Sequence, residues 1–217
     1  MRNMRFLALA ALLAALAPAA ARADTSAAAP WSVTVSAWGG RSRYDVVGLR
    51  DNASAISASD GRDLLSGNFT TQGLQGVLRL GWFEVGALWE GSWPRDGAGS
   101  VVVTPLAGFK WDLSDFWRVE VLGELGGHRV SGIGQSSSFD AAQVKSVWLP
   151  SVGIRPSLSL RAPVGPVRAV FSLTPFARWD LLRRTVTVDV AGSPGAYRSY
   201  DVGGSTLGLV GAVGIEL

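Results

Sequence analysis

Apolar and polar residues alternate along much of the chain after residue 30, and this period-2 pattern is typical of β-strands. In "WRVEVLGEL" (117–125), tryptophan, valine and leucine fall on one face, and arginine and glutamate fall on the other. Eight such segments occur, at residues 31–38, 73–80, 83–93, 101–111, 117–125, 148–160, 167–179 and 205–217. Most approach the roughly nine to eleven residues that a tilted strand needs to cross a membrane. The alternation is imperfect, because apolar residues also fall on the polar face: Val77, Leu88, Leu106, Leu122 and Phe176.

The connections between these segments alternate in length. Short turns are expected near residues 81–82, 112–116 and 161–166, and longer loops at 39–72, 94–100, 130–145 and 182–203. Short turns on one side and longer loops on the other are typical of an up-and-down membrane barrel. "TVTVDV" (185–190) also alternates and predicts a ribbon that extends the last two strands beyond the membrane. The predicted fold class is therefore all-β, an eight-stranded antiparallel up-and-down transmembrane β-barrel.

The N-terminal residues have the features of an export signal. "MRNMR" supplies positive charge, "FLALAALLAALA" is an apolar stretch too short to span a membrane, and "ARA" (21–23) is a small-residue cleavage site. We expect residues 1–23 to be a cleaved signal peptide and residues 24–217 to form one outer-membrane barrel domain.

Charge and cysteine content exclude several functional classes. The chain has 20 Lys and Arg against 17 Asp and Glu, and three of the basic residues, Arg2, Arg5 and Arg22, belong to the predicted signal. The remaining charges cancel, so nothing indicates nucleic-acid binding. The sequence contains no cysteine, which excludes disulfides, thiol nucleophiles and thiolate metal sites.

Alternation alone does not say which face of the barrel is inside. Aromatic residues on the apolar face gather near the segment ends, as expected for girdles at two membrane interfaces: Trp31, Phe83, Trp111 and Trp117 on the short-turn side, and Trp89, Trp93, Trp148 and Trp179 on the loop side. The polar face carries seven positive and seven negative residues, and a narrow lumen requires such matching because unpaired buried charge is costly. We therefore place the polar face inside. The predicted lumen charge network is Arg79, Glu84, Glu90, Lys110, Arg118, Glu120, Glu124, Arg155, Arg168, Arg178 and Glu216.

Together, the signal, the eight strands, the alternating turn lengths and the last strand, "LGLVGAVGIEL", resemble small outer-membrane barrels of the OmpX/Ail and OmpA-transmembrane type. The resemblance covers nearly all of residues 31–217 and rests on architecture. It implies a monomer in the outer membrane of a Gram-negative cell, inserted by the barrel-assembly machinery and in contact with membrane lipids and lipopolysaccharide. Members of this family usually end in Phe or Trp, whereas this chain ends in Leu217.

The chain's only histidine, His128, follows Glu120 and Glu124 at four-residue intervals. On a strand these carboxylates lie roughly 13 Å apart, so the three groups share a face without forming one site. Some small outer-membrane barrels are lipid A deacylases with a His-x-Ser motif, but the nearest serine here is Ser131, one position too late. His128 and Ser131 are thus the weak catalytic candidates, and we expect no metal or other cofactor.

The residues favour a structural or surface-interaction role with a closed lumen. Three alternatives stay open: a deacylase-like enzyme acting on lipid A, a narrow pore, and a soluble lipocalin-like carrier. The loop segment "GLRDNASAISASDGRDLL" (48–65) is a candidate partner surface. The prolines at 105, 150, 156 and 175 also fall within strands, where a missing N–H is awkward for a closed ladder.

Overall fold

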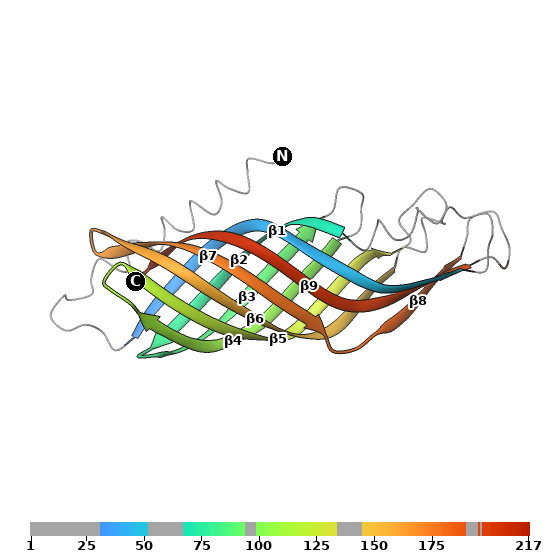
Figure 1. Ribbon diagram of the computed structural model, residues 1–217, viewed down its shortest axis with the longest axis horizontal. Coiled ribbons are helices and arrows are strands. Elements are labelled where there is room, and N and C mark those ends of the chain that lie inside the picture. Colours follow the sequence, from blue (N-terminus) through green and yellow to red (C-terminus); the bar gives the residue numbers. More distant parts are fainter. Residues whose placement is uncertain (1–30, 52–66, 94–98, 134–144, 190–194, 196) are drawn as a thin grey trace.

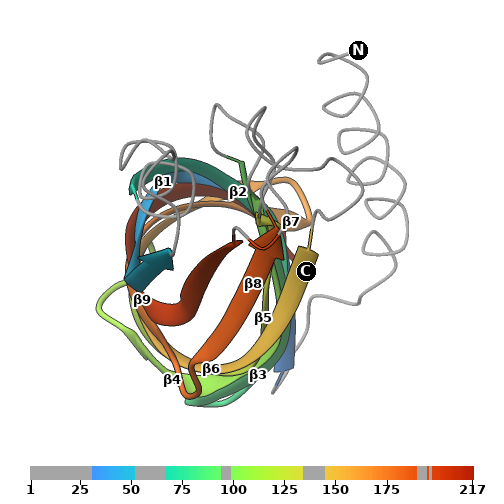
Figure 2. The same cartoon turned by 90° about the vertical axis from the view of Figure 1, so that its right-hand side faces the viewer.

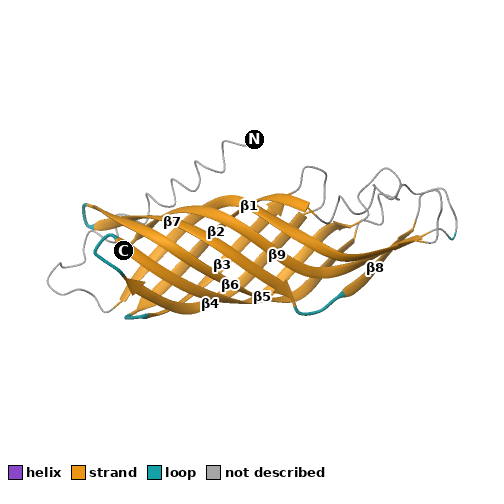
Figure 3. Ribbon diagram, in the orientation of Figure 1, coloured by secondary structure: helices purple, strands orange, loops and turns teal. Residues whose placement is uncertain are grey.

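The computed structural model describes residues 31–51, 67–93, 99–133, 145–189, 195 and 197–217. It contains nine strands (Figures 1 and 3): β1 Trp31–Asp51, β2 Gly67–Leu80, β3 Phe83–Trp93, β4 Gly99–Asp112, β5 Trp117–Ile133, β6 Lys145–Val164, β7 Val167–Asp180, β8 Arg184–Asp189 and β9 Tyr197–Glu216. Within these ranges no helix is long and apolar enough to cross a membrane. The predicted signal peptide, most of segment 48–65 and most of the predicted loop at 130–145 lie outside the described residues.

All neighbouring strands are antiparallel, and β1 pairs with both β2 and β9, which closes the sheet into a ring (Figure 2). The ring order is β1-β2-β3-β4-β5-β6-β7-β9. The remaining strand, β8, follows β7 after residues 181–183. It pairs with the N-terminal part of β9, residues 197–202. The predicted eight-stranded up-and-down barrel is therefore confirmed, and so is the pairing of the predicted ribbon.

The strand registers fix the width of the barrel. Following the paired residues once around the ring from Thr34 leads back to β1 at Tyr44, ten residues further along the strand. A ring of eight strands with this stagger has strands tilted by roughly 35–45° and an interior just wide enough for side chains to fill. Large side chains that point inward must therefore pack against one another.

The apolar residues that break the alternation have a common place inside the barrel. Val77, Leu88, Leu106, Leu122 and Phe176 are buried and pack together with Trp38 and Val210 across the lumen. We call these seven residues the middle apolar layer. The irregularities of the pattern are thus one packed cluster, contributed by seven of the eight strands of the ring.

Prolines interrupt the hydrogen-bonded ladder at defined places. The β6–β7 pairing is broken between Ile154↔Ala177 and Leu158↔Leu173, and the register places Pro156 and Pro175 opposite each other in that gap. The β4–β5 pairing is likewise broken at Pro105. Because two facing prolines share one gap, a single interruption accommodates both missing N–H groups.

Several strands extend further than the sequence pattern predicts. The predicted loop at 39–72 is much shorter, because β1 continues to Asp51 and β2 begins at Gly67. Inward-facing residues continue the alternation there, but the outward residues Arg41 and Arg43 are polar, so the apolar signal ends while the strand continues. The predicted long loop at 182–203 is also replaced in part by β8 and the start of β9.

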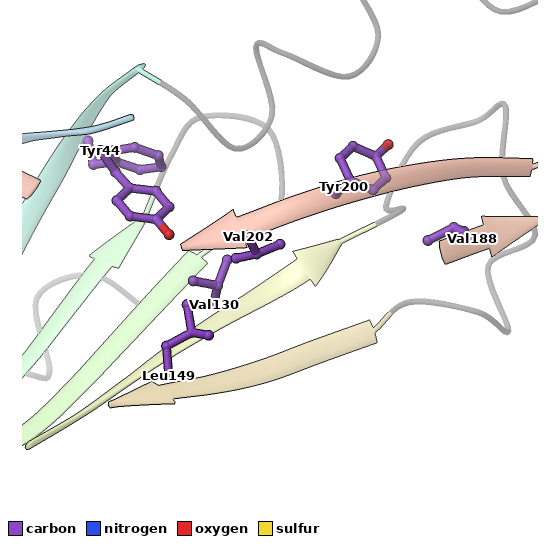
Figure 4. Packing of buried hydrophobic residues seen from close by; sticks show 7 residues of the cluster. Tyr44, Val130, Leu149, Val188, Tyr200 and Val202 are labelled. Carbon is purple, nitrogen blue, oxygen red and sulfur yellow. The ribbon is translucent and has the colours of Figure 1, made fainter. Parts of the chain in front are cut away.

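A second apolar cluster lies toward the loop-side end of the barrel. Figure 4 shows this cluster, which joins side chains from β1, β2, β5, β6, β8 and β9. Its members are Tyr44, Phe69, Val130, Leu149, Val188, Tyr200 and Val202. We call these seven residues the apical cap. Five strands of the ring and β8 contribute to it, so the cap packs the β8–β9 ribbon against the loop-side end of the barrel.

Candidate functional site

The charged groups described in the lumen form three clusters stacked along its length. The cluster nearest the short turns contains four cations, Arg79, Lys110, Arg118 and Arg161, and four carboxylates, Asp112, Glu84, Glu120 and Glu216. Arg79 Nε lies 2.6 Å from Glu84 Oε1, and Arg118 Nη1 lies 2.6 Å from Glu216 Oε2. Asp112 Oδ1 accepts from Arg118 Nε at 2.8 Å and lies 2.9 Å from Arg161 Nη2. The cluster is electrically neutral as a unit.

The middle cluster is a quartet of Arg155, Arg178, Glu90 and Glu124 from four different strands. Arg178 donates to Glu90 Oε1 at 3.0 Å and to Glu124 Oε2 at 2.8 Å, and Arg155 donates to Glu124 Oε1 at 3.0 Å. The guanidinium of Arg155 also lies 4.9 Å from the ring of Trp38 and 4.7 Å from that of Phe176. The quartet is therefore neutral and is held against the middle apolar layer by cation–π contacts.

The third cluster is centred on the carboxylate of Asp180, at the end of β7. His128 Nδ1 donates to Asp180 Oδ1 at 2.8 Å, and the hydroxyl of Tyr44 donates to Asp180 Oδ2 at 2.9 Å. The backbone N–H of Gly204 also donates to Oδ2, at 3.0 Å, and the rings of Tyr44 and His128 meet edge to face. One carboxylate thus joins β1, β5, β7 and β9.

His128 is buried in the lumen, with only 2% of its surface exposed. Ser131 does not join it. The hydroxyl of Ser131 donates to the carbonyl of Gly99 at 3.0 Å, and Ser131 lies three positions after His128, an odd offset that puts the two side chains on opposite faces of the strand. The structure therefore brings His128 together with Asp180 and Tyr44, and it holds Ser131 elsewhere.

The structure brings ten of the eleven predicted lumen charges into ion pairs. The eleventh, Arg168, is instead exposed next to the turn at 165–166, because it is the second residue of β7 and lies at the open end of the barrel. The predicted network does not contain three partners found here: Asp112, Arg161 and Asp180. Each directly follows the last residue of a predicted segment, 101–111, 148–160 or 167–179, and continues its polar face, so continued alternation was the signal that could have found them.

Tyr44 and Trp38 were missed for a different reason. Trp38 ends the first predicted strand, and Tyr44 falls in the predicted loop at 39–72, although Trp38, Ser42 and Tyr44 continue the inward alternation of β1. Among the described residues, no group of three or more His, Asp and Glu side chains is placed to hold a metal ion.

No family model and no curated protein matches the sequence. Among solved structures, the chain is similar to Neisserial surface protein A (NspA), with 10% identity and a TM-score of 0.49 over 87% of this chain and 99% of that one. It is also similar to Ail, the attachment invasion locus protein of Yersinia pestis, with 10% identity and a TM-score of 0.41 over 85% of this chain and 97% of that one. The translocator domain of the autotransporter NalP from Neisseria meningitidis is 14% identical, with a TM-score of 0.31 over 98% of this chain and 96% of that one. The described part of the chain is a closed eight-stranded antiparallel barrel, with β8 paired to β9 outside the ring.

Proposed function

We propose that this protein is an outer-membrane β-barrel of a Gram-negative cell envelope, with a closed, salt-bridged lumen and a structural or surface-interaction role. One observation carries the proposal: the wall is apolar outside and charged inside. Leu125, Leu207 and Val213 point outward and are 64%, 58% and 56% exposed, whereas Arg118, Arg155 and Arg178 are at most 2% exposed. This arrangement would destabilise a protein surrounded by water, and it stabilises one surrounded by lipid.

Aromatic side chains at both borders of the apolar wall support the same proposal. Trp31, Trp111 and Trp117 are 53%, 52% and 44% exposed at the short-turn end, and Trp148 and Trp179 are 52% and 47% exposed toward the loops. Indole rings at two levels fit the two interfaces of a bilayer. A soluble lipocalin-like carrier needs the opposite arrangement, with its apolar face inside, so the wall argues against that alternative.

The contents of the lumen favour a structural role over a pore or an enzyme. Two neutral ion-pair clusters, the middle apolar layer and the apical cap fill successive levels of the interior. Buried charges that pair with one another across the interior are typical of a stabilising network. The same proposal includes a monomer, insertion by the barrel-assembly machinery, and contact with membrane lipids and lipopolysaccharide.

Heat modifiability tests the proposal. We expect the protein, purified in detergent or inserted into phospholipid vesicles, to migrate differently on SDS gels before and after boiling, because a closed barrel resists SDS until it is heated. A single band position, together with solubility in detergent-free buffer, would contradict the membrane assignment and favour a soluble carrier.

A further inference from the structure

The wall of the barrel is interrupted on the loop side, between β6 and β8. The ladder between β6 and β7 ends at the pair Ser151 and Asp180. One further bond follows, in which the N–H of Leu181 donates to the carbonyl of Pro150 at 2.8 Å. Beyond that point β8 pairs with β9 alone, and among the described residues no backbone bond joins β8 to β6. We call the interval between residues 145–149 of β6 and β8 the slot.

The edge of β6 presents backbone groups to the slot. In an antiparallel sheet the N–H and C=O groups of successive residues point to opposite sides of their strand. The carbonyl of Pro150 points away from β5, toward the end of β7, where it accepts from Leu181. Ser146 and Trp148 follow the same alternation, so their N–H and C=O groups point into the slot, whereas Val147 is paired with β5. Within the described part of the chain this edge of β6 has no strand beside it, and such an edge is a template for another strand.

The facing edge of β8 is open in the same way. The carbonyl of Thr187 accepts from Lys145 Nζ, a side chain that crosses the slot from β6. Thr185 follows the same alternation as Thr187, so the backbone groups of both threonines point into the slot, and those of Val186 point toward β9. Two directly paired strands lie about 4.8 Å apart and bond through their backbones, whereas here a lysine side chain spans the distance. The slot is therefore wider than one strand spacing at this end, and it narrows toward Pro150.

The inner side of the slot is apolar. Val147 on β6 and Val186 on β8 are half-buried and pack against the apical cap. The cap residues next to them, Leu149 and Val188, are at most 1% exposed. A strand that lay in the slot would place every second side chain on this apolar surface and the others outward. The slot therefore suits an extended backbone in which apolar and polar residues alternate.

Resting on the proposed surface-interaction role, we propose that the slot binds an extended segment of another protein, which inserts as an additional strand between β6 and β8. The main chain of that segment bonds to both edges, and its apolar side chains pack on Val147 and Val186. The ammonium group of Lys145 leaves the carbonyl of Thr187, which then accepts from the inserted strand. An apolar small molecule could cover the two valines but would not use the backbone groups of either edge, so the observations favour a peptide.

Fluorescence anisotropy with labelled synthetic peptides tests the proposal on the full mature barrel in detergent. The first probe is a short capped peptide in which valine alternates with threonine. Two further probes carry N-methyl groups at every valine or at every threonine, so that each lacks the N–H donors along one of its edges. We expect the unmodified peptide to bind, and each methylated peptide to bind at least about tenfold more weakly, because insertion between two strands uses both edges.

Proline substitutions test the two edges of the protein. Ser146→Pro and Thr187→Pro each remove one N–H that points into the slot, and neither removes a donor to β5 or β9. We expect each substitution to weaken binding of the unmodified peptide by about three- to tenfold. Ser146→Ala and Thr187→Ala are the matched controls, because they keep the N–H, and both should bind the peptide as the native protein does.

The three peptides separate the possible occupants of the slot. Equal binding of all three would overturn the proposal and indicate an apolar site that recognises side chains alone. Sensitivity to only one methylation pattern would also overturn it, since that result indicates pairing with a single edge, and so would failure of the unmodified peptide to bind. Equal binding by the proline and alanine variants would contradict the assigned edges. The heat-dependent gel shift of the same samples reports on the barrel itself, so failure of the slot is distinguishable from failure of the membrane assignment.

Discussion

At the scale of single residues, glycines on the inner face make room for the large side chains that cross the lumen. A Cβ added at Gly73 would lie 2.4 Å from Trp38 Cζ2, and one added at Gly208 would lie 2.3 Å from the Phe176 ring. Trp38 and Phe176 are the two rings that hold Arg155. The glycines thus permit the contact between the middle apolar layer and the ion-pair quartet.

Gly73 and Gly76 on β2 offer a matched comparison. We expect Gly73→Ala to displace Trp38 and destabilise the barrel by about 1–3 kcal/mol, because the inserted methyl group overpacks the lumen. Gly76 points outward and an added Cβ meets nothing within 4 Å, so Gly76→Ala should leave stability nearly unchanged. Urea-induced unfolding in lipid vesicles, followed by tryptophan fluorescence, measures both. Equal effects of the two substitutions would show that the contact with Trp38 is not tight.

His128 illustrates how far residue spacing can be interpreted. Glu120 and Glu124 precede it at intervals that would gather the groups on a helix, but in the barrel they belong to different clusters: Glu120 pairs with Arg79, and Glu124 pairs with Arg155 and Arg178. Strand geometry predicts this separation. The partner of His128, Asp180, is 52 residues away in sequence, and only the register of the closed ring brings the two together.

At the scale of the strands, the alternating pattern predicted which strands exist and in what order better than it predicted their lengths. Each of the eight predicted segments overlaps a strand of the ring, because inward and outward faces differ in polarity across the apolar wall. Toward the loops, beyond the apolar wall, both faces of a strand carry polar residues, such as Arg41 and Arg43 on the outer face of β1. The alternation of apolar and polar residues therefore fades there, although the pairing of β1 with β9 continues to Asp51. Strand ends outside the wall therefore could not be predicted from alternation.

Asp180 lies at the corner where β7 ends and the chain turns toward β8. We expect Asp180→Ala to loosen the β8–β9 ribbon, because it removes the acceptor for Tyr44, His128 and the Gly204 N–H and leaves buried donors unpaired. Hydrogen exchange at residues 184–189 and 197–204 should become faster, while exchange in β3 and β4 stays unchanged. Tyr44→Phe, which removes one of the three donors, should have a smaller effect. Unchanged ribbon protection in Asp180→Ala would show that the cap alone holds the ribbon.

At the scale of the whole molecule, charge is balanced locally as well as in total. The turn-side cluster has four cations and four carboxylates, and the middle quartet has two of each. The equal counts on the polar face indicated that the charges pair, but the division into layers depends on the ten-residue stagger of the ring. That stagger follows from all registers together, which alternation in single segments does not specify.

The layered lumen leads to a prediction about ion flow. We expect the purified barrel to give no discrete conductance steps in planar lipid bilayers, because ion pairs, the middle apolar layer and the apical cap occupy successive levels of a narrow interior. The variant Val188→Ser/Val202→Ser, which weakens only the cap, should stay silent, since the two lower levels remain. A porin added to the same bilayer is the positive control. Steps from the native protein would contradict a closed lumen, and steps from the cap variant alone would identify the cap as the main barrier.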